Sequence, residues 1–349
     1  MEIVAGLDVH RAQITFDWMD TSTGECARGQ IRPANRAEVH RWLEQFAGRE
    51  AEFALESTTG WRYVVQEIQA AGHVAHLAEP ADTAAMRGRK RRAKTDKADA
   101  KLQRDLLQAG RLPESWIPPA HILEMRAIVR LYKTLTDQRR GWSQRIHAIL
   151  FHHGVAVPPD LSTRAGQAAV DAADVSPAGR EGVETARRMI EAIDQARTPL
   201  LGQIRWFATH QTGCKILMSF HGIGPIFAAA ILCELGDVSR FARACQVVRH
   251  AGIDVTVHAS DDKRAPGHLS RQGPEILRWA LYEAAQQASR AGSPYHRDYC
   301  QLKARLGHGR ATLSIARRLA REIYHALRPN ATLAIAEPVG DDSAATTAA

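Results

Sequence analysis

The sequence predicts a mixed α/β sheet in the first third of the chain and a mostly helical structure in the remainder. Short apolar runs typical of strands alternate with helical periodicity up to about residue 77. Longer helical periodicity then covers residues 122–153 and 184–210. Between the two patterns, a proline-containing segment at residues 112–119 marks a boundary. A chain of 349 residues is long enough for domains that each bury their own core.

The expected elements of the first third follow the order β-β-β-α-β-α-β-α. Strands are expected at residues 3–9, 14–18, 28–32, 52–56 and 73–77. Helices are expected after Asn35, after Gly60 and after Thr95, where Asn35 and Thr95 are capping residues. A polar turn at residues 21–25 makes an antiparallel start the simplest inference. This order is typical of a sheet of the ribonuclease H kind.

Four carboxylates occupy informative places in this order. Asp8 ends the first strand, Glu56 ends the fourth, and Asp96 and Asp99 lie one helical turn apart at a helix start. Each has an ordinary explanation alone, as a strand-end turn residue, a cap, or a solvated helix start with ion pairs. Carboxylates held close repel each other unless a cation lies between them. The ordered set predicts a site for two Mg²⁺ ions, about 3.5–4 Å apart, that serves phosphoryl transfer.

The charge balance predicts a polyanionic partner. Lys and Arg number 46 against 38 Asp and Glu, which gives a net charge of +8 and favours nucleic acid. Six cations directly before the acid pair are candidate backbone contacts: Arg87, Arg89, Lys90, Arg91, Arg92 and Lys94. The chain has no apolar run near the ~18 residues of a membrane span and no signal-peptide layout, so a cytoplasmic location without membrane contact is expected. Five scattered cysteines without a CxxC pair argue against a zinc site.

Two long amphipathic helices are expected in the middle of the chain. The helices over residues 122–153 and 184–210 would form an antiparallel, coiled-coil-like spacer. Residues 155–182 would join them as a loose connector or a tip between helices. The first helix suits a protruding arm, a dimer seam or a nucleic-acid contact. Pro199 is expected to bend or break the second helix.

The final third contains a predicted helix-hairpin-helix. In His221-Gly222-Ile223-Gly224-Pro225, Gly222 and Gly224 would let backbone N–H groups approach a phosphate closely. A plain corner between two helices explains the same pattern equally well. Residues 329–349 form an Ala/Thr/Asp-rich tail that is expected to be disordered.

Ser270 lies in a glycine-flanked loop before a helix that Pro274 is suited to begin. With Arg271 and Arg278 nearby in the sequence, a serine at this place could attack a phosphodiester, since cations and the helix dipole would stabilise the developing charge. A loop serine before a helix is, taken alone, far more often a cap.

Five short motifs, taken in order, resemble a known family. They are G-L-D-V-H-R at residues 6–11, L-E-S-T-T-G at 55–60, K-T-D-K-A-D-A at 94–100, H-G-I-G-P at 221–225 and G-H-L-S-R-Q-G-P-E-I-L-R at 267–278. Over residues 3–327 the chain resembles the insertion sequence 110 family of DEDD transposases. The resemblance implies a RuvC-like domain at 1–113, a coiled-coil spacer at 120–212, a serine transposase domain at 213–328 and a disordered tail at 329–349.

The resemblance also implies roles for particular residues and partners. Asp8, Glu56, Asp96 and Asp99 would be the magnesium-binding tetrad, and Ser270 the nucleophile that forms a covalent phosphoserine link to DNA. A structured non-coding bridge RNA would pair with target and donor DNA. The chain departs from the family pattern where Gly252-Ile253-Asp254-Val255 replaces G-L-x-P, and where arginine stands for the commoner lysine at Arg11.

Three functions are therefore compared. The first is a DNA transposase or recombinase that acts on double-stranded DNA, works as a homo-oligomer (dimer or tetramer) and associates with the nucleoid. The second is a RuvC-type structure-selective nuclease that uses water as its nucleophile. The third is a non-catalytic nucleic-acid-binding protein with a vestigial acid cluster.

Overall fold

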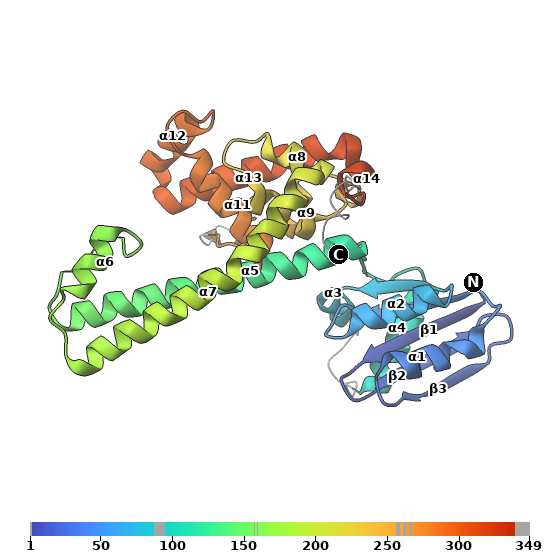
Figure 1. Cartoon of the computed structure of the whole chain (residues 1–349). Helices are drawn as coiled ribbons and strands as arrows, with labels where there is room; N and C mark the ends of the chain where they lie inside the picture. The colour runs from blue at the N-terminus through green and yellow to red at the C-terminus, as the bar shows by residue number, and fades with distance from the viewer. Residues whose placement is uncertain are drawn as a thin grey trace, which may run out of the picture. The chain divides into compact units, whose positions relative to one another are not determined.

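A computed structural model of the chain describes residues 2–86, 95–156, 158, 160–255, 259–260, 263–264 and 267–338. The structure contains two compact units, Met1–Ile117 and Pro118–Ala349, which are described separately (Figure 1). The predicted basic run at residues 87–94 lies outside the described residues.

Unit 1 is built on a six-stranded mixed sheet in the order β3-β2-β1-β4-β5-β6. Its strands are β1 (Ile3–Val9), β2 (Ile14–Asp20), β3 (Cys26–Ile31), β4 (Ala51–Glu56), β5 (Val74–Ala78) and β6 (Glu114–Ser115). The strand β1 pairs antiparallel with β2 and parallel with β4. The predicted mixed sheet is confirmed. The edge strand β6 was not predicted, because two residues carry no recognisable strand pattern.

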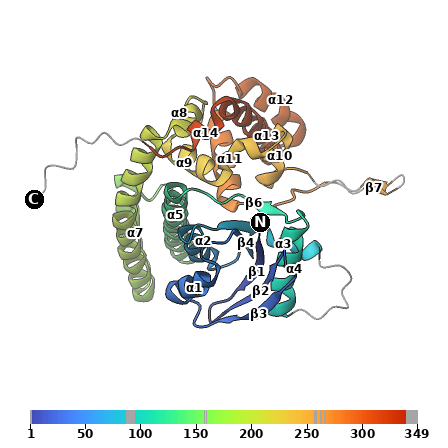
Figure 2. The same cartoon turned by 90° about the vertical axis from the view of Figure 1, so that its right-hand side faces the viewer.

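Helices cover both faces of this sheet (Figure 2). They are α1 (Arg36–Leu43), the 3-10 turn η1 (Glu44–Phe46), α2 (Trp61–Ala70), α3 (Pro80–Ala85) and α4 (Asp96–Gln108). On the α1 and α2 side, Phe46, Phe53 and Ile68 contribute to the main core. On the α4 side, Leu107 packs against Val4 and Ala54. Alternate residues of β1 and β4 thus pack into two different layers.

The helix α4 lies unusually close to β1. A Cβ atom at Gly6 would lie 1.9 Å from the carbonyl oxygen of Ala100 and 2.6 Å from the amide nitrogen of Arg104. The backbone of α4 therefore rests on β1 at a distance that only glycine permits. Beside this contact, the guanidinium of Arg104 donates to the carboxylate of Asp17 on β2, and both residues are buried. These two contacts fix α4 across the sheet.

Unit 2 is mostly helical. Its helices are α5 (Ala120–His152), α6 (Arg164–Asp171), α7 (Pro177–His210), α8 (Thr212–Met218), α9 (Pro225–Leu235), η2 (Val238–Arg240), α10 (Ala244–His250), α11 (Glu275–Ala288), α12 (His296–Leu306), α13 (His308–Leu327), η3 (Arg328–Asn330) and α14 (Ala331–Ala334), and its strands are β7 (Ala259–Ser260) and β8 (Lys263–Arg264). The helices α5 and α7 run antiparallel beside each other (Figure 1). Ile146 and Leu150 of α5 pack with Val183 and Ala186 of α7. The coiled-coil assignment for this pair stays a prediction.

The structure corrects two expectations about the long helices. Pro199 lies inside α7, which continues to His210, so the predicted break is wrong. A proline inside a helix costs about 3 kcal/mol, and packing on both sides of it, through buried Ile193 and Ile204, offsets this cost. The expected loose connector at residues 155–182 contains α6 and the first turn of α7. Val170 of α6 is buried in the same core, which orders a segment whose composition indicated a loop.

The beginning of the expected disordered tail is packed. Gln211 donates through Nε2 to the carbonyl oxygens of Ala334 and Ala336, at 2.7 and 2.9 Å. The short helix α14 buries Ala331 and Ala334. The expectation of disorder is corrected for this part of the tail, and residues 339–349 lie outside the described residues. None of the helices in the described part of the chain has the length and apolarity to cross a membrane.

Replacing Gly6 by alanine should destabilise the protein. The added methyl group would overlap the Ala100 carbonyl, so α4 would have to leave its place on β1. We expect the free energy of unfolding to fall by about 3 kcal/mol or more, measured by urea denaturation. Gly202→Ala in α7 is the matched control, because nothing lies within 4 Å of its added Cβ and helix propensity predicts a gain of up to about 1 kcal/mol. Wild-type stability of Gly6→Ala would contradict the close seating of α4.

Candidate functional site

The carboxyl end of β1 meets the first turn of α4. Oδ2 of Asp8 lies 3.1 Å from Nε2 of His10, and the same nitrogen lies 3.7 Å from Oδ1 of Asp96. One possible ligand atom from each of these three side chains lies within 4.8 Å of the other two. The structure thus brings together two predicted acids from distant segments, with a histidine between them.

Local structure explains why α4 begins at this place. Oγ1 of Thr95 accepts a hydrogen bond from the amide of Ala98 at 3.2 Å, which confirms the predicted cap. Asp96 and Asp99 therefore lie in the first turn of the helix. The unpaired N–H groups of a helix N-terminus carry partial positive charge, which favours acidic side chains there.

The other two predicted acids lie at the same end of the unit. Leu7 pairs with Leu55 in the parallel ladder, so Glu56 follows on β4 at the level of Asp8. Equivalent positions on parallel neighbours share a face of the sheet, which here is the face covered by α4. Asp99 acts on Asp8 electrostatically. The side chains whose possible ligand atoms lie within 4.8 Å of one another are those of Asp8, His10 and Asp96.

The sequence prediction gave no role to two polar residues beside the acids, His10 and Gln13. Nε2 of Gln13 donates to Oδ2 of Asp96 at 3.3 Å, and Arg32 donates to Oε1 of Gln13. The amide of His10 donates to the carbonyl of Gln13 at 3.0 Å, which closes the turn between β1 and β2. The position of His10 two residues after Asp8 could have indicated that it belongs to the acid site. The contact of Gln13 with α4 could not be recognised from the sequence.

Electrostatics disfavours charge on Asp8. Burial raises its pKa above the ordinary value, His10 acts in the opposite direction, and the negative charges of Asp96 and Asp99 raise it further. Because the folded protein holds this proton more tightly than the unfolded chain, ionisation of Asp8 lowers stability as pH rises through its raised pKa. A divalent cation would relieve the repulsion, and carboxylate oxygens are the ligands that Mg²⁺ prefers. The residues present fit such a cation.

Ser270 lies in unit 2, in the loop that precedes α11. Its hydroxyl donates a hydrogen bond to Oδ1 of Asp254, and its amide donates to the carbonyl of Asp254 at 3.2 Å. One residue outward on each segment, Val255 and Leu269 form an isolated antiparallel bridge. The loop is therefore paired along its length with the segment that follows α10.

Two glycines allow these segments to pair so closely. A Cβ at Gly252 would lie 2.2 Å from the carbonyl oxygen of Gln272, and a Cβ at Gly273 would lie 1.9 Å from that of His250. Both glycines have a positive φ, and so does Arg271, at 52°. A left-handed conformation costs a non-glycine residue about 1–2 kcal/mol. Such strain is common beside reactive groups, and here it directly follows Ser270.

Two guanidinium groups lie beside the segment that pairs with the Ser270 loop. Nη1 of Arg278 is buried without a hydrogen-bond partner in the described part of the chain. This nitrogen would lie 2.8 Å from a Cβ at Gly252. From α13, Nε of Arg317 donates to the carbonyl of Ile253 at 2.6 Å. Burial lowers the pKa of Arg317, the neighbouring Arg321 lowers it further, and Asp254 opposes both. An anionic phosphate would be attracted to such a place.

Packing explains one glycine of the predicted helix-hairpin-helix. The helices α8 and α9 flank the turn, as the sequence indicated. A Cβ at Gly222 would lie 2.6 Å from the carbonyl oxygen of Ala284 and 2.8 Å from the amide nitrogen of Ala288. Nothing lies within 4 Å of the corresponding position at Gly224. The close approach to α11 accounts for Gly222, and phosphate binding by the turn stays a prediction.

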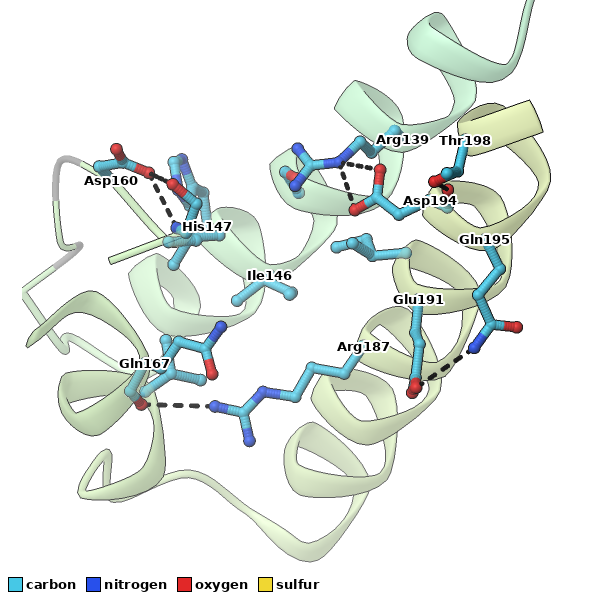
Figure 3. A pocket seen from close by; sticks show the side chains of 15 residues that line it. Arg139, Ile146, His147, Asp160, Gln167, Arg187, Glu191, Asp194, Gln195 and Thr198 are labelled. Atoms are coloured by element: carbon cyan, nitrogen blue, oxygen red, sulfur yellow. Dashed lines mark hydrogen bonds and ion pairs between the residues drawn. The ribbon is translucent and has the colours of Figure 1, made fainter. Parts of the chain in front are cut away.

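A separate cavity of about 940 Å³ lies between α5, α6 and α7 (Figure 3). Two of the arginines that line it form ion pairs. Nε of Arg139 donates to both carboxylate oxygens of Asp194 at 2.9 Å, and Arg187 forms an ion pair with Asp171 at 2.6 Å. None of the predicted site residues lines this cavity. We therefore take the acid cluster of unit 1 and the Ser270 loop of unit 2 as two separate candidate sites.

Comparison with known proteins gives two matching family models. A model for DEDD transposases of the IS110 type, described as "Transposase", matches residues 5–153, which contain all four predicted acids. A second model, described as "Transposase IS116/IS110/IS902 family", matches residues 214–301, which contain Ser270. Together the two models cover more than half of the chain.

Individual relatives show the same similarity. The inferred transposase y4rJ of Sinorhizobium fredii is 28% identical over 246 residues, which are 64% of this chain and 62% of y4rJ. The uncharacterized 44.8 kDa protein of insertion element IS116 from Streptomyces clavuligerus is 32% identical over 127 residues, which are 36% of this chain and 32% of that protein. The matched segments thus span less than two thirds of these relatives. Because models of this one family match residues 5–153 and 214–301, which together are more than half of the chain, the chain belongs to the IS110 family of transposases.

Proposed function

We propose that the protein is a DNA transposase or recombinase that cleaves and joins strands by metal-dependent phosphoryl transfer, with Ser270 as the nucleophile. The observation that carries this proposal is the convergence of Asp8 and Asp96 where β1 meets α4. Burial and mutual repulsion of carboxylates are costly unless a cation is bound, so the cluster is explained better by chemistry than by stability.

The acids of unit 1 would hold the metal. Asp8 and Asp96, with Glu56 and Asp99 alongside, would bind Mg²⁺, two ions by the family resemblance. The bound metal supplies Lewis acidity and neutralises charge that develops on the phosphate. Gln13 keeps Asp96 in place, and His10 holds the two carboxylates until a cation competes for them.

The loop of unit 2 would supply the nucleophile. Attack by Oγ of Ser270 on phosphorus forms a phosphoserine bond and releases a sugar oxygen of the cleaved strand. Attack by a hydroxyl of another strand then reverses the chemistry and restores the serine. Arg271, Arg278 and Arg317 would stabilise the charge of the phosphate during both steps. The strand hydroxyl, rather than water, resolves the intermediate, so the ends are joined instead of lost.

The partners follow from charge and from the family. A net charge of +8 suits double-stranded DNA at the element ends and target, and such a protein would associate with the nucleoid. The family resemblance implies guidance by a structured bridge RNA. We propose that Arg87 to Lys94 and the α8–α9 turn contact nucleic-acid backbones. We also propose that the protein acts as a homo-oligomer, a dimer or a tetramer, because the reaction must handle several strands at once.

The Ser270→Ala variant should form no covalent protein–DNA adduct, because it lacks the attacking oxygen. Wild-type and variant proteins would be incubated with end DNA of the element, Mg²⁺ and co-purified RNA, and adducts detected by denaturing electrophoresis. Ser314→Ala is the control, since it removes an exposed hydroxyl that donates to Arg310 on α13. Adducts that persist in Ser270→Ala would overturn the assignment. Mg²⁺-dependent hydrolysis that continues without adducts would instead indicate the water-using nuclease.

The Asp8→Asn variant should be more stable than wild type in the absence of divalent ions, because the net effect of the fold is to disfavour charge on Asp8. Added Mn²⁺ or Mg²⁺ should raise the melting temperature of wild type but not that of the variant. The affinity for Mn²⁺ should fall by at least about tenfold. Asp137→Asn, at an exposed carboxylate on α5, is the control. Equal metal-induced stabilisation of Asp8→Asn and wild type would exclude Asp8 as a ligand.

A further inference from the structure

We propose that Asp254 is the proton acceptor and donor for Ser270, so that the nucleophile of this protein works as an Asp–Ser pair. The inference rests on the proposed role of Ser270 and adds a catalytic residue that no sequence motif indicated. Asp254 occupies the third position of Gly252-Ile253-Asp254-Val255, where the family pattern G-L-x-P specifies no residue.

The direction of the hydrogen bond distinguishes this pair from a helix cap. A capping serine accepts a hydrogen bond through Oγ from the backbone N–H two or three residues later. Oγ of Ser270 instead donates to Oδ1 of Asp254. The helix α11 begins at Glu275, with Pro274 at its cap position. Ser270 is therefore not the cap of α11, and its proton already points to a carboxylate.

The surrounding backbone holds the pair in place from three sides. The two loops are held together by the hydrogen bond from the amide of Ser270 to the carbonyl of Asp254 and by the bridge of Val255 with Leu269. These backbone contacts keep the side chains of Ser270 and Asp254 next to each other. Gly252 lets the opposite segment approach within contact distance. From α13, Arg317 binds the carbonyl next to Asp254. Such support is what a nucleophile and its base require, because proton transfer depends on a hydrogen-bonded geometry.

The chemistry balances at each step. When Oγ of Ser270 attacks phosphorus, its proton passes to Oδ1 of Asp254, the Oγ–P bond forms, and the bond from phosphorus to the leaving sugar oxygen breaks. That oxygen takes a proton from water and becomes a free hydroxyl. In the joining step a strand hydroxyl attacks the phosphoserine and loses its proton to solvent. Asp254 then returns its proton to Oγ of Ser270 as the Oγ–P bond breaks.

The other groups near the pair are poorly suited to accept this proton. Arg278 on α11 and Arg317 and Arg321 on α13 carry guanidinium groups, which have no acceptor. On α10, burial lowers the pKa of His250 to about 4, with Arg240 and Arg126 adding to the effect. His250 is therefore a weak base, and its Nε2 lies 3.2 Å from Nη2 of Arg240, which can only donate to it. His268 lies two residues before Ser270 on the same loop, and we expect it to take no part in this proton transfer.

The test compares the Asp254→Asn variant with wild type in the adduct assay at a series of pH values. Asparagine keeps the shape of the side chain and can accept the same hydrogen bond, but it is a far weaker base. We expect the rate of adduct formation to fall by about 10²–10⁴. The remaining rate should rise with pH, since hydroxide must then take the proton, whereas the wild-type rate should stay nearly constant over pH 7–8.5. Urea denaturation would verify that the variant is folded.

Two control variants isolate the role of Asp254. Glu275→Gln removes an exposed carboxylate from the first turn of α11, and His268→Gln removes the histidine of the loop. Both should keep the wild-type pH profile. An unchanged rate and profile in Asp254→Asn, while Ser270→Ala forms no adduct, would overturn the role of Asp254 and leave Ser270 as the nucleophile. Absence of adducts in wild type would overturn the proposed function, and the Asp–Ser pair with it.

Discussion

The missing side chain of Gly6 is the constraint on which the candidate metal site depends. The backbone of α4 rests on β1 at this glycine, where a single methyl group would overlap the Ala100 carbonyl. The buried pair of Arg104 and Asp17 prevents α4 from sliding along the sheet. The contact with Gly6 lies about one turn after the start of α4. The first turn of α4 therefore lies over the end of β1. The position of Asp96 relative to Asp8 is thus a consequence of backbone packing.

The same arrangement lowers the stability of the folded protein through electrostatics. Burial and two neighbouring acids raise the pKa of Asp8, so the folded protein would be more stable with that charge removed. A core built only for stability would place an apolar or paired residue there. In unit 2, the left-handed conformation of Arg271 in the Ser270 loop and the unpartnered, buried guanidinium nitrogen of Arg278 on α11 also oppose stability. These destabilising groups lie at the two places where the proposed phosphate chemistry would need them. This agrees with the trade-off between stability and activity that is known in enzymes.

The sequence predicted those features that depend on local patterns. The strands that end at Asp8 and Glu56 follow from apolar runs, and the start of α4 follows from the cap at Thr95. Features that depend on contacts between distant segments were not predictable in this way. The hydrogen bond between Ser270 and Asp254 exists because two loops pair through glycines, and no spacing in the chain indicates that pairing. Packing also ordered α6 and the beginning of the tail, since buried apolar side chains outweighed a composition typical of loops.

Diffraction from crystals soaked in Mn²⁺ would test the central claim most directly, because anomalous scattering locates the cation without assumptions about its ligands. The account predicts a peak between the end of β1 and the first turn of α4, within coordination distance of carboxylate oxygens of both Asp8 and Asp96. A peak bound to neither residue, or none there at Mn²⁺ concentrations that support DNA cleavage, would contradict it.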